Sequence, residues 1–254
     1  MDFTPLNSFF DSIYVITLER ETERQQKIAT ALEGLNYTFS FGVDKKDLTI
    51  DDLVEDKIYD EQKAIAVHHE DKPMNTGQIG RSWSHRLVYE DMLKNGYKKI
   101  LILEDHIVPN KEGLALFEEM TKELPADWEL LYLDYYKNLR RSFKTWFIQQ
   151  GYHIKRLFGK LKWSAETINN LYARKFKEHL FIAGVHDFAS AYAITNTAAK
   201  KLVDLQTPLA FVADDLLAHA CSNKLIHGFV SCPKVFLQEG QLQDKKTKAD
   251  YAEE

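Results

Sequence analysis

Three consecutive residues that can bind a metal or exchange a proton follow a short apolar run. The run covers residues 100–103, and Glu104, Asp105 and His106 come directly after it. An apolar run without polar alternation is typical of a strand that is buried on both faces. Ligand sites in open α/β sheets lie just beyond the carboxyl ends of such strands. The alternative is a strand followed by a plain polar turn, and the segments around it favour a functional site.

Two arginines follow another apolar segment, residues 13–18. Arg20 and Arg24 lie at the start of a predicted helix that ends at Gly34. Arginines just beyond a strand could hold a phosphate through forked hydrogen bonds. The alternative is a solvated helix start, which the residues alone favour.

Paired acids open a late helix after Pro208. Asp214 and Asp215 lie in the predicted first turn, where carboxylates suit the helix dipole, so capping alone would explain them. Asp187, near the start of a small-residue strand, is a third candidate acid.

Two glycines mark the start of a helix that precedes residues 100–103. Gly77 and Gly80 permit a close approach of the backbone, and the N–H groups of a first helical turn favour an anion. His85 follows on the same helix. A Gly-x-x-Gly pair is weak evidence alone, and its interest lies in its place one helix before the Glu104-Asp105-His106 strand.

These residues are positioned by a predicted alternation of strands and helices. The predicted strands cover residues 13–18, 37–41, 100–103, 128–134 and 186–195, and a last pair of strands, separated at Pro233, covers 229–237. Helices fill most of the intervals between them, and acids stand at strand ends, which predicts an α/β fold with a mostly parallel sheet flanked by helices. The 254 residues contain no repeat or interdomain linker, so a single domain over 1–254 is expected.

Residues 137–180 differ from the rest in charge. They contain eleven Lys or Arg and two Glu, a local charge of +9, whereas the remainder carries −14 of the total −5. Aromatic and aliphatic residues are interleaved with the cations. Basic amphipathic segments of this kind sit at anionic membrane surfaces, and an equally good reading is a surface helical hairpin packed on its own domain. Nucleic acid is a weaker third reading, because no recognised motif accompanies the basic stripe.

The cysteines and the distribution of apolar residues indicate where the protein is located in the cell. Cys221 and Cys232 form no metal-ligand spacing and no disulfide framework, which favours a reducing compartment. No signal peptide and no apolar span are evident, so we expect a cytoplasmic protein that rests, at most, peripherally on the inner membrane. Residues 239–254 are polar and predicted to be a mobile tail.

With these segments in order, the chain resembles glycosyltransferase family 25, the bacterial lipopolysaccharide and lipooligosaccharide galactosyltransferases related to collagen galactosyltransferases. The family opens with a strand, Asn-Leu and spaced arginines, similar to residues 13–18 with Arg20 and Arg24. Its Gly-Glu-Ile-Gly-Cys and Ser-His motifs are similar to residues 77–85, and its Leu-Ile-Leu-Glu-Asp-Asp strand resembles residues 101–106.

Further along the chain, the Tyr, apolar, Ser, Ala, Leu pattern of the family is similar to residues 190–202, and its acid at the start of a late helix to Asp214. The resemblance implies a GT-A-like (Rossmann-like) fold with 137–180 as a basic helical insertion. It also implies inverting transfer of a sugar, galactose from UDP-galactose, to a lipid-linked lipooligosaccharide or lipopolysaccharide acceptor. The rival hypothesis is a nucleotide-sugar-binding scaffold that has lost catalysis.

The resemblance assigns roles to individual residues. The donor-side residues would be Thr17, Leu18, Arg20, Arg24, His85, Glu104 and Asp105. Asp214 would be the catalytic base, with Asp215 and Asp187 as alternatives, and His85 a structural or donor-side hydrogen-bonder. The metal, Mn²⁺, would be held by Asp105 and His106.

The chain departs from the family pattern at several positions, one of which concerns this metal. Thr17 replaces an Asn, Gln78 and Arg81 replace a Glu and a Cys, and His106 stands where the family has the last acid of its triplet. Imidazole can ligate Mn²⁺, whereas Mg²⁺ prefers oxygen. Three options follow: His106 as a ligand, Asp105 in its place, or a site that uses Arg20 or Arg81 without a metal.

Overall fold

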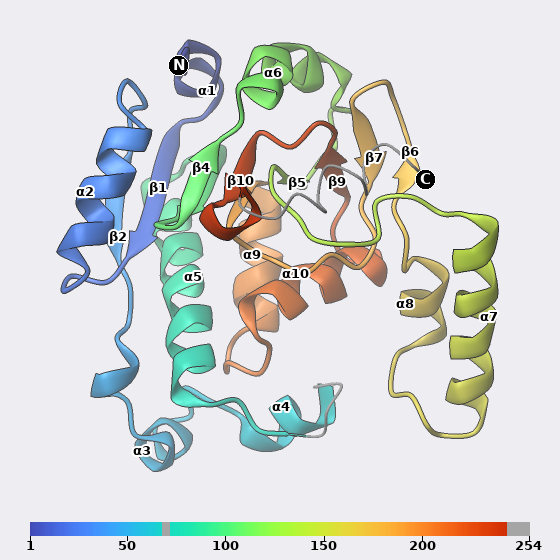
Figure 1. The fold of residues 1–254 in the computed structure, drawn as a ribbon. Coiled ribbons are helices and arrows are strands. Elements are labelled where there is room, and N and C mark those ends of the chain that lie inside the picture. The colour runs from blue at the N-terminus through green and yellow to red at the C-terminus, as the bar shows by residue number, and fades with distance from the viewer. Residues whose placement is uncertain (68–71, 243–254) are drawn as a thin grey trace.

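The computed structural model describes residues 1–67 and 72–242, in which helices cover both faces of a central sheet (Figure 1). The sheet has eight strands in the order β2-β1-β3-β8-β5-β9-β7-β6. They are β1 (Ser12–Thr17), β2 (Thr38–Phe41), β3 (Lys99–Glu104), β5 (Leu130–Tyr132), β6 (Arg174–Lys175), β7 (Leu180–Ile182), β8 (Ala191–Thr195) and β9 (Gly228–Ser231). A second sheet pairs β4 (Ile107–Pro109) with β10 (Phe236–Gln238).

Helices fill the intervals between these strands. The α-helices are α1 (Thr4–Phe9), α2 (Thr22–Ala31), α3 (Ile50–Glu55), α4 (Glu61–Val67), α5 (Thr76–Asn95), α6 (Lys111–Glu123), α7 (Phe143–Leu157), α8 (Ala165–Asn169), α9 (Asn196–Leu205) and α10 (Ala213–Ser222). Short 3-10 helices are η1 (Lys45–Asp47) and η2 (Glu239–Leu242). The predicted α/β fold, with a Rossmann-like GT-A arrangement, is confirmed.

The sheet is mixed in strand direction. β1 runs parallel to both β2 and β3, and β5 runs parallel to β9. β8 lies between β3 and β5 and is antiparallel to both, and β7 and β6 continue antiparallel at the edge. The parallel portion of the sheet is therefore interrupted at its centre by β8, which strand patterns in the sequence do not reveal.

Alternation along β3 divides its side chains between two cores. Ile100 and Ile102 pack in a cluster with residues of α5, α9 and α10 on one face of the sheet. Leu101 and Leu103 pack in a second cluster with residues of α1, α2 and α6 on the other face. Because successive side chains of a strand point to opposite faces, Glu104 lies on the same face as Ile102 and points toward α5.

The parallel register brings two strand ends together. Ile16 of β1 is the partner of Glu104 of β3, so Thr17 and the residue after Glu104 leave the sheet at the same edge. Ile100, Leu101, Ile102 and Leu103 are fully buried, as the apolar run predicted.

The basic segment 137–180 supplies α7, α8, β6 and the first residue of β7. Figure 1 shows α7 at the rim of the molecule beside α8, outside the helices that cover the sheet. Of the predicted tail 239–254, the first four residues form η2, and 243–254 lie outside the described residues. No helix among the described residues is both long and apolar enough to cross a bilayer.

Candidate active site

The ends of β1 and β3 are joined by side-chain hydrogen bonds. The Thr17 hydroxyl donates to Asp105 Oδ2 at 2.7 Å, and Arg24 Nη1 of α2 lies 3.5 Å from Asp105 Oδ1. Burial raises the pKa of Asp105, but the nearby His106 imidazole, the hydrogen bond from Thr17 and the charge of Arg24 outweigh it and lower the pKa. Asp105 is therefore an ionised, largely buried acid held between the first strand, the second helix and its own turn.

Glu104, the residue before Asp105, forms hydrogen bonds with two residues of α5. Arg81 Nε donates to Glu104 Oε1 at 2.7 Å, and His85 Nε2 lies 3.0 Å from the same oxygen. Burial of Glu104 raises its pKa, but the Arg81 charge, the His85 hydrogen bond and the charges of His85 and His106 lower it to about 2. Glu104 is consequently a fixed anion whose carboxylate is already occupied by protein donors.

His85 continues into a buried chain of hydroxyl groups. Its Nδ1 lies 2.7 Å from the Tyr192 hydroxyl, which lies 2.6 Å from the Tyr89 hydroxyl. Arg81, His85 and Tyr89 follow at intervals of four along α5, so they share one face of the helix. His85 is 1% exposed, so its imidazole is available to Glu104 and Tyr192 and not to solvent.

Arg81 connects the strand end to the late helix. Its Nη1 lies 3.8 Å from Asp214 Oδ1, in the first turn of α10, while its Nε remains on Glu104. The backbone N–H of Phe188 donates to the other oxygen of Asp214 at 3.4 Å. Burial would lower the pKa of Arg81, but Glu104 and Asp214 raise it, so one guanidinium stays charged between two carboxylates.

A cavity of about 690 Å³ opens beside Asp214. It lies among α7, α8, α10 and the segments that follow β5 and β7, and its wall includes Lys137, Tyr152, Trp163, Asp187, Asp214 and Asp215. Aromatic rings together with a few charged and polar groups are the usual lining of a site for a polar organic ligand. The three candidate acids predicted from the sequence therefore border one cavity.

The other predicted residues take different positions. Arg20 forms an ion pair with Asp44 after β2, so its guanidinium is already occupied. The Leu18 carbonyl accepts a hydrogen bond from the Gln25 side chain at 2.8 Å. Asp187 is paired with Lys137 Nζ at 2.7 Å, and Asp215 is exposed. Asp214 contacts Arg81, whose Nη1 lies 3.8 Å from its Oδ1.

His106 and Asp105 are the residues that fit a metal at this edge. His106 Nδ1 lies 3.9 Å from Asp105 Oδ1, close enough for both to bind one cation, and His106 Nε2 lies 3.5 Å from Glu104 Oε2. Burial lowers the pKa of His106, but Asp105 and Glu104 raise it overall. Glu104 is less suited to a metal because Arg81 and His85 already contact one of its oxygens.

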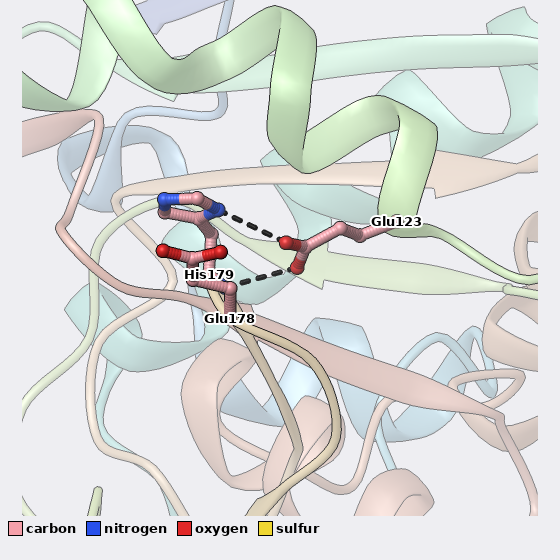
Figure 2. Close-up of side chains that lie close together, drawn as sticks. All are labelled: Glu123, Glu178 and His179. Carbon is pink, nitrogen blue, oxygen red and sulfur yellow. Dashed lines mark hydrogen bonds and ion pairs between the residues drawn. The ribbon is translucent and has the colours of Figure 1, made fainter.

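A separate cluster of possible metal ligands lies at the opposite edge of the sheet from β2. Among the described residues, Glu123, Glu178 and His179 bring three ligand atoms within 4.8 Å of one another, where α6 ends near the β6–β7 turn (Figure 2). Glu123 accepts from the His179 backbone N–H at 2.9 Å and lies 3.0 Å from its Nδ1. These bonds tie α6 to the turn, which gives the cluster a structural role without an ion.

Arg81 joins the two carboxylates of the candidate site, and no definite role was predicted for it from the sequence. Its interval of four from His85 placed both on one helix face, and this signal was available. The long-range contact with Asp214 was not, because it depends on how α10 packs against α5. Gly80, one residue earlier, allows α5 to approach the loop after β2, since an added Cβ would lie 2.8 Å from the Val43 carbonyl oxygen. The predicted anion site is replaced there by a capping box between Asn75 and Gln78.

Comparisons with known proteins agree on one family. The family model "Glycosyltransferase family 25 (LPS biosynthesis protein)" matches residues 10–217. A "Glycosyltransferase 25 family member" of Aedes aegypti is 26% identical over 197 residues, which are 76% of this chain and 28% of the relative. A protein of the same description from Anopheles gambiae is 29% identical over 155 residues, 56% of this chain and 24% of the relative. The matched part thus spans about a quarter of these relatives.

Proposed function

The chain belongs to glycosyltransferase family 25, and from this premise we propose that it transfers a sugar from a nucleotide donor to a hydroxyl group of an acceptor. The observation that carries the proposal is the position of Arg81. Its guanidinium contacts Glu104 at the end of β3 and Asp214 at the start of α10. A donor held at the strand end and an acceptor held beside the late helix would therefore meet at this arginine.

The donor is assigned to the edge formed by Thr17 and Asp105. A nucleotide diphosphate carries several negative charges, and Arg24 and Arg81 provide permanent positive charges on either side of this edge. Arginine suits phosphate because its planar fork can make two parallel hydrogen bonds. Leu18 and Arg20 lie next to this edge in the chain, and Arg20 would have to leave Asp44 to reach the donor.

Asp214 is assigned as the base that accepts the proton of the attacking hydroxyl. In this step the acceptor oxygen forms a bond to the anomeric carbon, and the bond from that carbon to the diphosphate oxygen breaks. The proton goes to Asp214, and the bonding electron pair leaves with the diphosphate. Direct displacement inverts the anomeric configuration. Arg81, 3.8 Å from Asp214, would stabilise the negative charge that develops on the departing diphosphate.

A divalent cation is assigned to Asp105 and His106. The donor set of one carboxylate and one imidazole suits Mn²⁺ better than Mg²⁺. When bound, such a cation neutralises diphosphate charge, and His106 would have to be neutral to bind it. Arg24 and Arg81 already contribute positive charge at the same place, so part of the donor affinity should persist without metal.

The identities of the two substrates follow from the family resemblance. UDP-galactose is the proposed donor, and a lipid-linked lipooligosaccharide or lipopolysaccharide chain is the proposed acceptor. The cavity beside Asp214 supports an acceptor of this class, because Tyr152 and Trp163 contribute aromatic rings to its wall and polar groups border the same space. A lipid-linked acceptor would bring the basic segment 137–180 close to a membrane surface.

The test is a panel of nucleotide sugars, assayed for donor hydrolysis and transfer with Mn²⁺ and with a chelator. We expect turnover with a UDP-hexose, lost in Asp105→Ala although the variant stays folded. Asp214→Asn should lose turnover and retain UDP binding by calorimetry. Asp215→Asn, one residue away, separates the two adjacent candidate bases, because loss of turnover in that variant instead would assign the role to Asp215. UDP binding with no turnover on any donor would favour the nucleotide-sugar-binding scaffold instead. Full activity of Asp105→Ala would refute the site.

A further inference from the structure

The outer face of α7 carries a stripe of exposed apolar side chains, which is interrupted near its middle by Gln150 and Gly151. This apolar stripe consists of Phe143, Trp146, Phe147, Ile154, Leu157 and Phe158. Phe143, Leu157 and Phe158 are 78%, 79% and 74% exposed. Intervals of four and seven along a helix place such residues on one side, so the stripe runs from the first turn to the C-cap. Exposed apolar surface of this extent marks an interaction site.

The opposite face of α7 is fixed to the protein. Gln149 is 3% exposed and its side-chain amide donates to the Ile168 carbonyl of α8. His153 Nε2 lies 3.1 Å from the side-chain oxygen of Asn169, and the rings of Tyr152 and Trp163 meet edge to face at 5.4 Å. These contacts set the rotation of α7, so the stripe points away from the body of the molecule.

Cations flank this stripe without any acid among them. Residues 140–162 contain seven Lys or Arg and no Asp or Glu. Lys144, Lys155, Arg156 and Lys160 are all exposed. By helical periodicity Lys144 and Lys155 lie on the same flank, beside the apolar face. The surface therefore combines apolar insertion with a purely positive border.

We propose that α7 binds an anionic lipid bilayer, with the apolar stripe inserted at the boundary between headgroups and acyl chains and the flanking cations paired with lipid phosphates. Helices with an aromatic apolar face and a basic polar face lie in the plane of such interfaces. The positive border argues against a second copy of this chain as the occupant. A two-fold contact through α7 would place the same uncompensated cations opposite one another.

Membrane binding through α7 also orients the candidate active site. Tyr152, on the inner side of α7, borders the cavity that contains Asp214, and so do Lys162 and Trp163 from the loop that follows. The helix thus has one side toward lipid and the other toward the cavity. A lipid-linked acceptor could enter from the bilayer with its sugar chain leading. This orientation rests on the proposed function, whereas binding to lipid does not.

The experiment uses the full chain and no substrate. Sedimentation is measured with vesicles of phosphatidylcholine alone and of phosphatidylcholine mixed with phosphatidylglycerol. We expect binding to the mixed vesicles, weakened by salt. Replacing Lys144, Lys155, Arg156 and Lys160 by Gln should weaken binding by more than about a hundredfold, since each cation contributes roughly fivefold. Phe143→Ser/Phe147→Ser/Leu157→Ser should weaken it by at least about tenfold.

Two control variants and a probe of insertion depth distinguish insertion of α7 from nonspecific binding to the vesicles. Val54→Ser on α3 and Lys122→Gln on α6 remove an exposed apolar side chain and an exposed cation elsewhere, and should leave binding unchanged. Lipids brominated near the glycerol end should quench tryptophan fluorescence, and Trp146→Phe should lose most of that quenching.

Three results would overturn the proposal: no binding to anionic vesicles, equal weakening in the control variants, or a self-associated chain that the stripe variant converts to monomer without any vesicle binding. Donor hydrolysis in solution, measured on the same stripe variant, should equal that of the unmodified protein. If the stripe variant loses vesicle binding and keeps hydrolysis, the loss is therefore due to α7 and not to the candidate active site. If the unmodified protein binds vesicles but hydrolyses no donor, the proposed function is refuted and the lipid-binding role of α7 is not.

Discussion

Replacing Arg81 by Met tests the link between the two carboxylates of the candidate site. The change removes the guanidinium that contacts Glu104 and Asp214 and keeps a side chain of similar length. We expect both the free energy of unfolding and the affinity for UDP to fall. The first effect arises because Glu104 stays buried with less counter-charge, and the second because the diphosphate loses a permanent cation.

The magnitude follows from the pKa of Glu104. Burial raises this pKa, yet its value is about 2 against an ordinary 4.5. Each pKa unit corresponds to about 1.4 kcal/mol, so the neighbours of Glu104 stabilise its charged form by about 3 kcal/mol net of burial. The charge of Arg81 is the largest of the contributions that lower the pKa, and its side chain is 34% exposed. After allowance for solvent screening, we expect Arg81→Met to cost about 2 kcal/mol.

The pH dependence of this loss has a definite sign. The pKa of Glu104 is depressed in the folded protein, so its contribution to stability is present above the ordinary value of 4.5 and is lost as pH falls toward 2. The difference between the unmodified protein and Arg81→Met should therefore be largest at neutral pH and shrink in acid. Urea unfolding at a series of pH values measures it.

A matched control and a double variant make the test decisive. Lys122→Met removes an exposed cation that is paired with Glu118 across one turn of α6, and should cost less than about 0.5 kcal/mol. Adding Glu104→Gln to Arg81→Met should recover much of the lost stability, because the side chain at position 104 is then neutral. The reasoning is refuted if Arg81→Met costs no more than Lys122→Met, or if the double variant recovers nothing.

Three further predictions concern the stability of the folded protein. Burial lowers the pKa of His186 from 6.5 to about 4, so the free energy of unfolding should fall by about 3 kcal/mol as pH drops from 6.5 to 4. His186→Gln should remove this pH dependence in urea unfolding, and an unchanged slope in the variant would show that His186 is not its source. Lys234→Met should cost about 3–5 kcal/mol, because it leaves the fully buried Asp134 without the ammonium 3.1 Å away, and adding Asp134→Asn should recover most of it. Gly80→Ala should cost about 1–3 kcal/mol in thermal unfolding, whereas Gly151→Ala, with open space around its Cβ, should be neutral or stabilising; equal effects would show that the contact of Gly80 is unimportant.

The sequence predicted the strand end at Glu104 because a buried strand leaves an unbroken apolar run. The sequence also predicts that Glu104 and Asp105 point in different directions. Because side chains alternate along a strand, Glu104 lies on the same face of the sheet as Ile102 and α5. The central position of β8 could not be predicted in this way, because strand order depends on pairing between distant segments.

The basic segment shows a different limit of sequence reasoning. Its apolar residues suited both burial against the domain and exposure on a surface, because amphipathic periodicity is the same in the two cases. The structure separates these readings: Gln149 faces α8, while Phe143 and Leu157 face outward. The contact of Arg81 with Asp214 is likewise a product of packing between α5 and α10, which no local pattern specifies.

A crystal structure of the protein soaked with UDP and Mn²⁺ would locate the donor site directly. We expect the diphosphate at the edge formed by Thr17 and Asp105, within reach of Arg24 and Arg81, with manganese at Asp105 and His106. UDP bound away from this edge, without contact to Asp105 or Arg81, would refute the proposed donor site.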